Sequence, residues 1–320
     1  MFFCWVLLIV GMVLLIKGAD FFVDGSSGIA KRFGIPSLII GLTLVSLGTS
    51  APEISISINA VLDGSSDMSV GNVVGSNICN IFLILGISAI FTPLIISREI
   101  KIYDIPIMLF IFFALIVFSF LITPNVINWY EGIILLLLFI SYTIFLIIRA
   151  KKTIETKKED DNEAKPNMLK CVIFVILGLC AIIYGGDLVV DNARSIALKL
   201  GMSETLVSLT IVAVGTSLPE LVTSAVAAFK KEGDIAVGNV IGSCIFNIVL
   251  ILGIASVIAP IGNAGMLSVA DVISFDLIVM IFGGLALLAI SLFSKKVNRW
   301  QGIIFLAIYI GYIVYIVIRN

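Results

Sequence analysis

The second half of the chain repeats the first at a constant offset of 167 residues. Gly, Pro, Glu, Asn and Asp recur at fixed positions in both copies, so chance matching of common apolar residues does not explain the pattern. We infer an internal duplication. The matched segments are GADFFVDG at 18–25 with GGDLVVDN at 185–192, GTSAPE at 48–53 with GTSLPE at 215–220, and DMSVGNVVGSNICNIFLILGI at 67–87 with DIAVGNVIGSCIFNIVLILGI at 234–254.

Each copy is built from long apolar runs. The chain is 60% hydrophobic and 13% charged, whereas soluble domains are about 45–50% apolar and about 25% charged. Since a membrane-spanning helix needs about 20 apolar residues, we expect an all-α integral membrane protein with ten transmembrane helices. This composition excludes soluble enzymes, and the net charge of −1 gives no basic face for nucleic acid. The expected spans are 2–30, 36–62, 69–94, 104–122, 131–148, 170–198, 205–229, 235–260, 267–293 and 301–318.

A charged segment divides the chain into two sets of five spans. The predicted organisation is a first five-helix repeat at 1–148, a linker at 149–169 and a second five-helix repeat at 170–320. Because each repeat has an odd number of spans, the two repeats must enter the membrane from opposite sides, as inverted repeats. Most Lys and Arg residues fall on the linker's side, which is typical of the cytoplasmic face. We therefore expect a multi-pass protein of the cell membrane, with a cytoplasmic linker and extracellular termini.

Glu53 and Glu220 lie at equivalent positions in the middle of apolar runs. An acidic side chain at the bilayer centre costs on the order of 2.5–3.5 kcal/mol, so its occurrence in both repeats favours a bound cation as compensation. The alternative is a carboxylate that only bonds to a neighbouring helix. Each Glu directly follows a proline, which removes a backbone N–H from the helix and frees carbonyl oxygens one turn earlier. Pro52 and Pro219 are thus expected to kink their helices and to expose carbonyl ligands.

The following helix of each repeat carries two polar side chains four residues apart, hence on one helical face. These pairs are Ser76 with Asn80 and Ser243 with Asn247. The glycines of the same segment, such as Gly71, are expected to permit close helix packing. Two carboxylates, freed carbonyls and amide oxygens supply about six or more ligands, which suits Ca²⁺ better than Mg²⁺. The chain contains no histidine, and nitrogen and sulfur donors are not placed to favour zinc or copper.

The paired GTSxPE and GNxxGSxxxN motifs resemble the alpha repeats of the cation/Ca²⁺ exchanger superfamily, and most closely those of prokaryotic Na⁺/Ca²⁺ exchangers. The two alpha motifs would span 41–87 and 208–254, and the resemblance covers essentially all ten expected helices. It implies that Glu53 and Glu220 bind Ca²⁺ together with the main-chain carbonyls of Thr49 and Thr216. Asn80 and Asn247 would contact water or an ion at the centre. Some members of the superfamily have Asp at the second of these positions.

The resemblance also implies two Na⁺ sites beside the carboxylates. The first would use Ser46, Ser50 and Ser76 with Glu53, and the second Ala213, Ser217 and Ser243 with Glu220. Ser46 and Ala213 would contribute their main-chain carbonyls.

The leading functional hypothesis is therefore a secondary antiporter that exchanges Ca²⁺ for Na⁺ by alternating access. Its main alternative is H⁺/Ca²⁺ antiport through the same glutamates, with their affinity for protons raised by burial and mutual repulsion. A passive cation channel and an intramembrane hydrolase fit the motifs less well. We expect no enzyme activity, no cofactor, no catalytic residue and no nucleic-acid partner. The expected partners are Ca²⁺ and Na⁺ as substrates and the lipid bilayer, without an obligatory protein partner.

Overall fold

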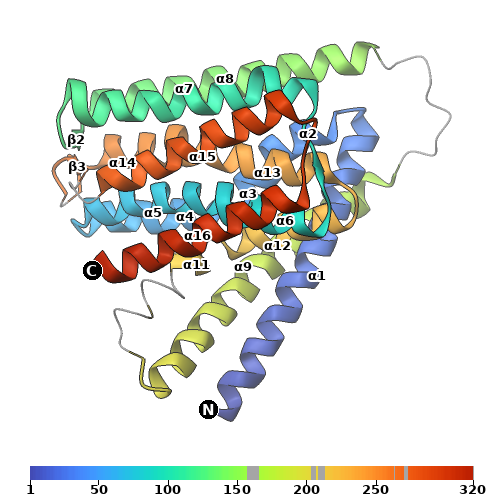
Figure 1. Cartoon of the computed structure of the whole chain (residues 1–320). Helices are drawn as coiled ribbons and strands as arrows, with labels where there is room; N and C mark the ends of the chain where they lie inside the picture. Colours follow the sequence, from blue (N-terminus) through green and yellow to red (C-terminus); the bar gives the residue numbers. More distant parts are fainter. Residues whose placement is uncertain (157–165, 203–206, 208–212, 263, 270–272, 320) are drawn as a thin grey trace.

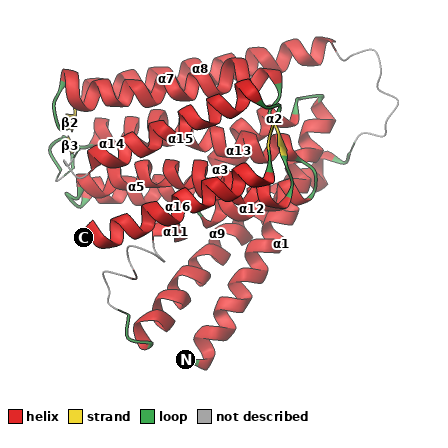
Figure 2. Ribbon diagram, viewed as in Figure 1, coloured by secondary structure: helices red, strands yellow, loops and turns green. Residues whose placement is uncertain are grey.

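Helices form almost the whole of the described chain (Figures 1 and 2). Figure 1 shows a computed structural model that describes residues 1–320 except 157–165, 203–206, 208–212, 263, 270–272 and 320. The predicted helical class is confirmed. Among the described residues, eight helices are long and apolar enough to span a membrane, and a ninth is obtained if one bent pair counts as a single span.

The first half of the chain contains a helix that is broken between Thr49 and Ala51, within the repeated GTSAPE motif. Short π-helical segments, in which the hydrogen bond reaches one residue further than in an α-helix, occur within several of its helices. Its helical elements are α1 (Phe2–Phe33), α2 (Ser37–Ile40), η1 (Gly41–Val45), α3 (Ser46–Thr49), α4 (Ala51–Leu62), α5 (Ser66–Ile78), η2 (Cys79–Ile84), α6 (Leu85–Phe91), η3 (Ile100–Asp104), α7 (Ile105–Ile116), η4 (Val117–Ile122) and α8 (Trp129–Thr156).

The second half has corresponding elements. They are α9 (Met168–Lys199), α11 (Ala213–Gly215), α12 (Leu218–Phe229), α13 (Gly233–Phe246), η6 (Asn247–Leu252), α14 (Gly253–Ile258), α15 (Ile273–Phe293) and α16 (Arg299–Arg319). The expected span at 205–229 is described mainly through α11 and α12, because 203–206 and 208–212 lie outside the described residues. The start of the second alpha motif at 208 falls there too.

The two largest differences from the expected boundaries are at the end of the fifth span and at the start of the ninth. α8 continues to Thr156, so the helix extends beyond the expected end of its span at 148. The reason is that Arg149 is not solvated: its guanidinium contacts Asp104 Oδ1 at 2.7 Å and Glu99 Oε2 at 2.8 Å. Likewise, the helix expected from 267 begins at Ile273, because residues 267–268 form a strand.

Two short antiparallel ribbons connect the halves. β1 (Leu94–Ile95) pairs with β4 (Lys296–Val297), and β2 (Val126–Ile127) pairs with β3 (Leu267–Ser268). The ribbons lie at opposite ends of the bundle, coloured yellow in Figure 2. Each joins one strand from each half, so the two halves fold into one body.

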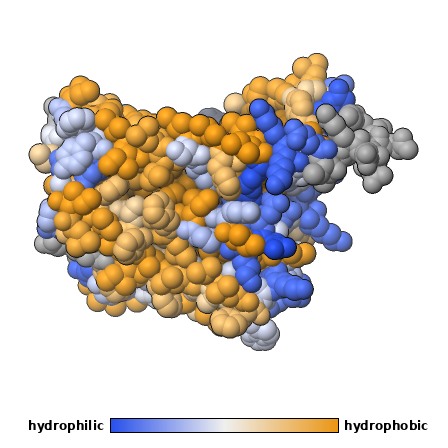
Figure 3. Space-filling view, turned by 90° about the horizontal axis from the view of Figure 1, so that it is seen from above, coloured by the Kyte–Doolittle hydropathy of each residue, from blue (hydrophilic) through white to orange (hydrophobic). Residues whose placement is uncertain are grey.

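The two helices that carry the repeated GN motif occupy the core. In the most apolar stretches of Ser66–Phe91 and Gly233–Ile258, 83% and 78% of residues are buried, whereas the other long helices reach at most 39%. The outer helices expose large apolar side chains, such as Phe110 and Phe113 on α7. Figure 3 shows this surface as largely hydrophobic, with hydrophilic residues gathered at one end. The outer helices therefore face lipid and enclose the motif helices.

α1 and α9 pack against each other through glycines. A Cβ at Gly18 would lie 2.8 Å from the Gly178 carbonyl oxygen, and one at Gly185 would lie 2.8 Å from Leu15 N. Such distances are too short for any side chain, so the two backbones are in direct contact. The expected packing role also holds for Gly238, where a Cβ would lie 2.7 Å from Leu38 O. For Gly71 it stays a prediction, since the residues equivalent to Leu38 lie outside the described ones.

Candidate ion-binding site

The first GTSxPE motif ends one helix and begins another. α3 ends at Thr49, α4 begins at Ala51, and the segments on either side of Ser50 differ in direction by 47°. A kink within a continuous helix was expected, but the structure has a complete break. Pro52 lies in the first turn of α4, where its missing N–H costs no hydrogen bond. The break leaves Glu53 in that same first turn, at the positive end of the α4 dipole.

The second motif repeats this geometry. α11 ends at Gly215 and α12 begins at Leu218, with Pro219 and Glu220 in its first turn. The N–H of Leu221 donates to the Ser217 carbonyl at 2.9 Å, matching the 3.1 Å bond from Ile54 to Ser50. Thus both glutamates are presented by the same local structure.

Both carboxylates are buried, and several of their oxygens have no hydrogen-bond donor. The side chains of Glu53 and Glu220 are each about 1% exposed. Within the described part of the chain, no hydrogen bond reaches either carboxylate oxygen of Glu53 or Oε2 of Glu220. The side-chain oxygens of Ser217, Asn80 and Asn247 also lack partners there. Leaving so many buried acceptors unsatisfied is costly, and a cation is the group that would satisfy them together.

Residues of the two halves meet at these carboxylates. Ser50 Oγ lies 2.9 Å from Glu220 Oε1 and 3.1 Å from Ser243 Oγ. Glu53 and Glu220 lie close enough for their charges to interact, and Ser76 and Ser217 are neighbours of the Glu53 carboxylate. No cluster of three or more Asp, Glu, His or Cys side chains suited to a metal exists among the described residues. A cation held here would therefore use two carboxylates and neutral oxygens.

The other residues expected at the site lie around this centre. Asn80 is the second residue of η2, and Asn247 is the first residue of η6. The backbone is therefore π-helical at both amide side chains. The Ser46 carbonyl accepts the N–H of Ser50 at 3.0 Å. Thr49 is fully buried, whereas Thr216 is half-buried. Ala213 begins α11, and its side chain lies outside the described ones.

Sequence reasoning missed three asparagines that support the site. Asn72 Nδ2 donates to Ser57 Oγ at 3.0 Å and to the Glu53 carbonyl at 3.3 Å. Asn239 makes the equivalent bonds in the second half, and Asn77 accepts a 3.0 Å bond from the Asn247 amide. For the first two, the signal was present: each is the Asn of the GN pair that begins the repeated motif.

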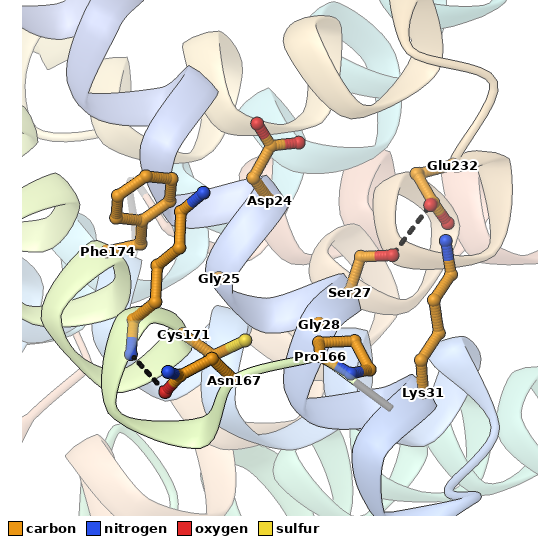
Figure 4. Close-up of a pocket in the computed structure, with 11 residues that line it drawn as sticks. Asp24, Gly25, Ser27, Gly28, Lys31, Pro166, Asn167, Cys171, Phe174 and Glu232 are labelled. Carbon is orange, nitrogen blue, oxygen red and sulfur yellow. Dashed lines mark hydrogen bonds between the residues drawn. The ribbon is translucent and has the colours of Figure 1, made fainter. Parts of the chain in front are cut away.

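Of two cavities in the structure, one is lined by residues of the GTSxPE motifs and the other is not. One of 140 Å³ is lined by Pro52, Thr216 and Pro219 from the motifs and by Asp187 and Asp191 from α9. It therefore reaches the breaks in both motif helices. The other has a volume of 520 Å³ and lies between the ends of α1 and α9, where Ser27 donates to Glu232 at 2.7 Å (Figure 4). No residue expected at the ion site lines this larger cavity.

Comparison with known proteins agrees with this architecture. The family model for the sodium/calcium exchanger protein matches residues 3–148 and 170–318. The sodium/calcium exchanger MaX1 of Methanosarcina acetivorans is 34% identical, with 97% of each chain covered. The putative antiporter CaxA of Alkalimonas amylolytica is 36% identical, with 96% of each covered.

Solved structures of the sodium-calcium exchanger NCX_Mj share the fold. One obtained with Na⁺ and Sr²⁺ has a TM-score of 0.81 at 36% identity, covering 97% of each chain. Another, with Na⁺ and Ca²⁺, has a TM-score of 0.82 at 35% identity, covering 98% of each. The breadth of these matches and the paired motifs lead to one conclusion: the chain is a multi-span membrane protein that belongs to the sodium/calcium exchanger family.

Proposed function

We propose that this protein is a secondary antiporter that exports Ca²⁺ in exchange for Na⁺ by alternating access. The observation that carries the proposal is the pair of buried carboxylates, Glu53 and Glu220, with three oxygens that lack hydrogen-bond donors among the described residues. Two carboxylates neutralise one Ca²⁺, and the main-chain carbonyls of Thr49 and Thr216 would complete its shell with water or the amides of the central helices. Ca²⁺ binds about 6–8 oxygen ligands and tolerates a flexible coordination geometry, so a site of this kind suits it.

Na⁺ is the proposed driving ion because hydroxyl groups stand beside both carboxylates. Ser50 and Ser243 are hydrogen-bonded to each other next to Glu220, and Ser217 has a buried hydroxyl without a partner among the described residues. Hydroxyl oxygens and a shared carboxylate edge suit a hard monovalent cation. The proposed Na⁺ ligands are Ser46, Ser50, Ser76, Ala213, Ser217 and Ser243. The contacts of Ser50 with Glu220 and Ser243 support sites that combine both halves, in place of the sets from single halves that were expected from the sequence.

We further propose that the chain spans the membrane ten times, as two inverted repeats at 1–148 and 170–320. The tenth span would include the residues preceding α12 that lie outside the described ones. In Figure 1, α8 ends at the right of the view and α16 ends with the C-terminus at the left. This arrangement supports a linker and a C-terminus on opposite sides of the membrane, with the linker in the cytoplasm.

Ligand-dependent stability tests the proposed site directly. A ligand that binds only the folded protein raises its melting temperature as the ligand concentration exceeds Kd. We expect Ca²⁺ to stabilise the purified protein at concentrations at which Mg²⁺ does not, and Glu53→Gln to abolish the Ca²⁺ effect. Equal stabilisation of the variant and the native protein by Ca²⁺ would place Ca²⁺ elsewhere.

A further inference from the structure

Asn239 connects the two halves of the chain at the candidate site. Its Nδ2 lies 2.9 Å from Ser224 Oγ and 3.5 Å from the Glu220 carbonyl, and its Oδ1 accepts the Thr49 hydroxyl at 3.1 Å. The Asn239 side chain is fully buried. One amide therefore holds both the helix that presents Glu220 and the break that precedes Glu53.

The Thr49 hydroxyl has two other acceptors within reach, since it lies 3.1 Å from the Val45 carbonyl and 3.4 Å from the Ser46 carbonyl. A hydroxyl donates only one hydrogen at a time. If that hydrogen pointed to either carbonyl, Asn239 Oδ1 would be a buried acceptor without a donor among the described residues, which is unfavourable. The bond to Asn239 is therefore the more stabilising choice.

The equivalent residues of the other half make only part of this arrangement. Asn72 bonds to Ser57 and to the Glu53 carbonyl, as Asn239 does to Ser224 and Glu220. Yet among the described residues no hydrogen bond joins Asn72 to Thr216, the repeat partner of Thr49. The serines that follow these threonines differ in the same way. Ser50 donates a hydrogen bond to Glu220, whereas Ser217 Oγ has no partner in the described part of the chain.

The two breaks also differ in their access to solvent. The cavity of 140 Å³ opens beside Thr216. Thr216 is half-buried, whereas its repeat equivalent Thr49 is fully buried and does not line this cavity. The cavity also touches Pro52, so the difference concerns the threonines: the one bonded to Asn239 lies on a closed side, and the unbonded one lies on the open side.

An ion pair lies further out on that closed side. Lys230 Nζ lies 2.6 Å from a carboxylate oxygen of Asp20 and 2.6 Å from one of Asp24, so it ties α1 to the end of α12. Its repeat equivalent is Asp63, which cannot make this contact with Asp187 and Asp191. The bond from Asn239 to Thr49, in contrast, uses residues that are identical in both repeats.

We propose that Asn239 and Asn72 are paired positioning residues, which hold Thr49 and Thr216 in alternation. Asn239 holds Thr49 while the path beside Thr216 is open, and Asn72 bonds to Thr216 when the path beside Thr49 is open. This inference rests on the proposed alternating-access function. Since the two repeats carry the same residues, exchanging their conformations yields the opposite state. Each bond stabilises one state only and so biases their equilibrium.

Two threonine variants test this with opposite signs. Thr49→Val and Thr216→Val keep the side-chain shape and the main-chain carbonyl but remove the hydroxyl. Reporter cysteines at Ile183, in the open cavity, and at Val23, buried on the closed side, would be labelled with a water-soluble maleimide. The labelling uses detergent-purified protein from which the five native cysteines have been removed. The ratio of the two labelling rates measures the balance between the states.

We expect the ratio of labelling at 183 to labelling at 23 to fall in Thr49→Val and to rise in Thr216→Val. Each change should be about two- to tenfold, the usual effect of one hydrogen bond on an equilibrium. Thr49→Ser and Thr216→Ser keep the hydroxyl and should leave the ratio unchanged. A shift in the same direction in both valine variants, or no shift in either, would overturn the proposal. Because labelling requires no transport, a failure of Na⁺-driven exchange would be detected separately.

Discussion

Ser50 and Glu220 are 170 positions apart in the chain, yet the Ser50 hydroxyl donates to Glu220 Oε1 at 2.9 Å. The contact joins the helix break of one half to the carboxylate of the other. Each proposed ion site would therefore draw ligands from both halves, and a movement of one half against the other would change the coordination of the bound ion.

Neutralising either central glutamate should nearly abolish transport. In Glu53→Gln or Glu220→Gln, half of the charge that offsets Ca²⁺ is lost in a buried site, and such losses typically cost about 2–5 kcal/mol. We expect Na⁺-dependent ⁴⁵Ca²⁺ uptake to fall about 30-fold or more in each variant. Near-normal uptake by either properly inserted variant would remove that glutamate from the site.

Glu131 offers a matched control for these substitutions. It is also about 1% exposed, but its Oε2 accepts the N–H of Asn128 at 2.8 Å at the start of α8. At the corresponding start of α16, Gln301 accepts the N–H of Asn298 at 2.7 Å. Glutamine thus performs the same capping role in this chain, so Glu131→Gln should retain uptake within about twofold.

Removing two serine hydroxyls should weaken Na⁺ use more than Ca²⁺ binding. The double variant Ser76→Ala with Ser243→Ala loses one proposed Na⁺ ligand in each half but keeps both carboxylates. We expect a several-fold higher Na⁺ concentration for half-maximal exchange, with a smaller change in the Ca²⁺ requirement. Ser119→Ala is the control, since Ser119 is equally buried but lies in η4. Equal shifts for both ions would argue against separate Na⁺ sites.

Part of this architecture could be predicted from the sequence. The apolar runs predicted a helical membrane protein, and the repeated motif predicted that Glu53 and Glu220 would share one environment, as they do in the structure. Their roles as ligands remain predictions. The offset between repeats could not show that Pro52 begins a new helix, because a proline both kinks helices and starts them.

Contacts between segments that are distant in the chain could not be predicted from the sequence. The sequence assigns Arg149 to a solvated linker because charged residues follow it, and only the contact between η3 and α8 reveals its pairing with Asp104. The bond between Thr49 and Asn239 was missed for a similar reason, since it joins residues 190 positions apart. The first contact depends on packing within one half and the second on how the two halves dock, and no local pattern encodes either.

The glycine contact between α1 and α9 should be sensitive to a single methyl group. In Gly18→Ala the new Cβ would lie 2.8 Å from the Gly178 carbonyl oxygen, so the backbones must separate. Overpacking of this kind costs about 1–3 kcal/mol, and we expect a lower melting temperature in detergent. Gly311→Ala is the control, because no described atom lies within 4 Å of its new Cβ. If both variants melt like the native protein, the interface is looser than the structure indicates.

The proposed topology can be tested by labelling from one side of the membrane. Single cysteines within 157–165 and near the C-terminus, in a background without native cysteines, should react with an impermeant maleimide from opposite sides. The reason is that five spans separate them in the inverted-repeat arrangement. The linker should react from the cytoplasm. Labelling of both positions from the same side would eliminate the ten-span arrangement.

Na⁺-dependent ⁴⁵Ca²⁺ uptake into proteoliposomes is the most direct test of the proposed exchange. Vesicles loaded with Na⁺ and diluted into Na⁺-free buffer containing ⁴⁵Ca²⁺ should accumulate Ca²⁺, and an ionophore that collapses the pH gradient should leave the uptake intact. The neutral amides Asn80 and Asn247 support this expectation, since neither side chain exchanges protons. Uptake that does not depend on internal Na⁺ and disappears when the proton gradient is collapsed would contradict Na⁺/Ca²⁺ exchange. It would assign H⁺/Ca²⁺ exchange to the same two glutamates.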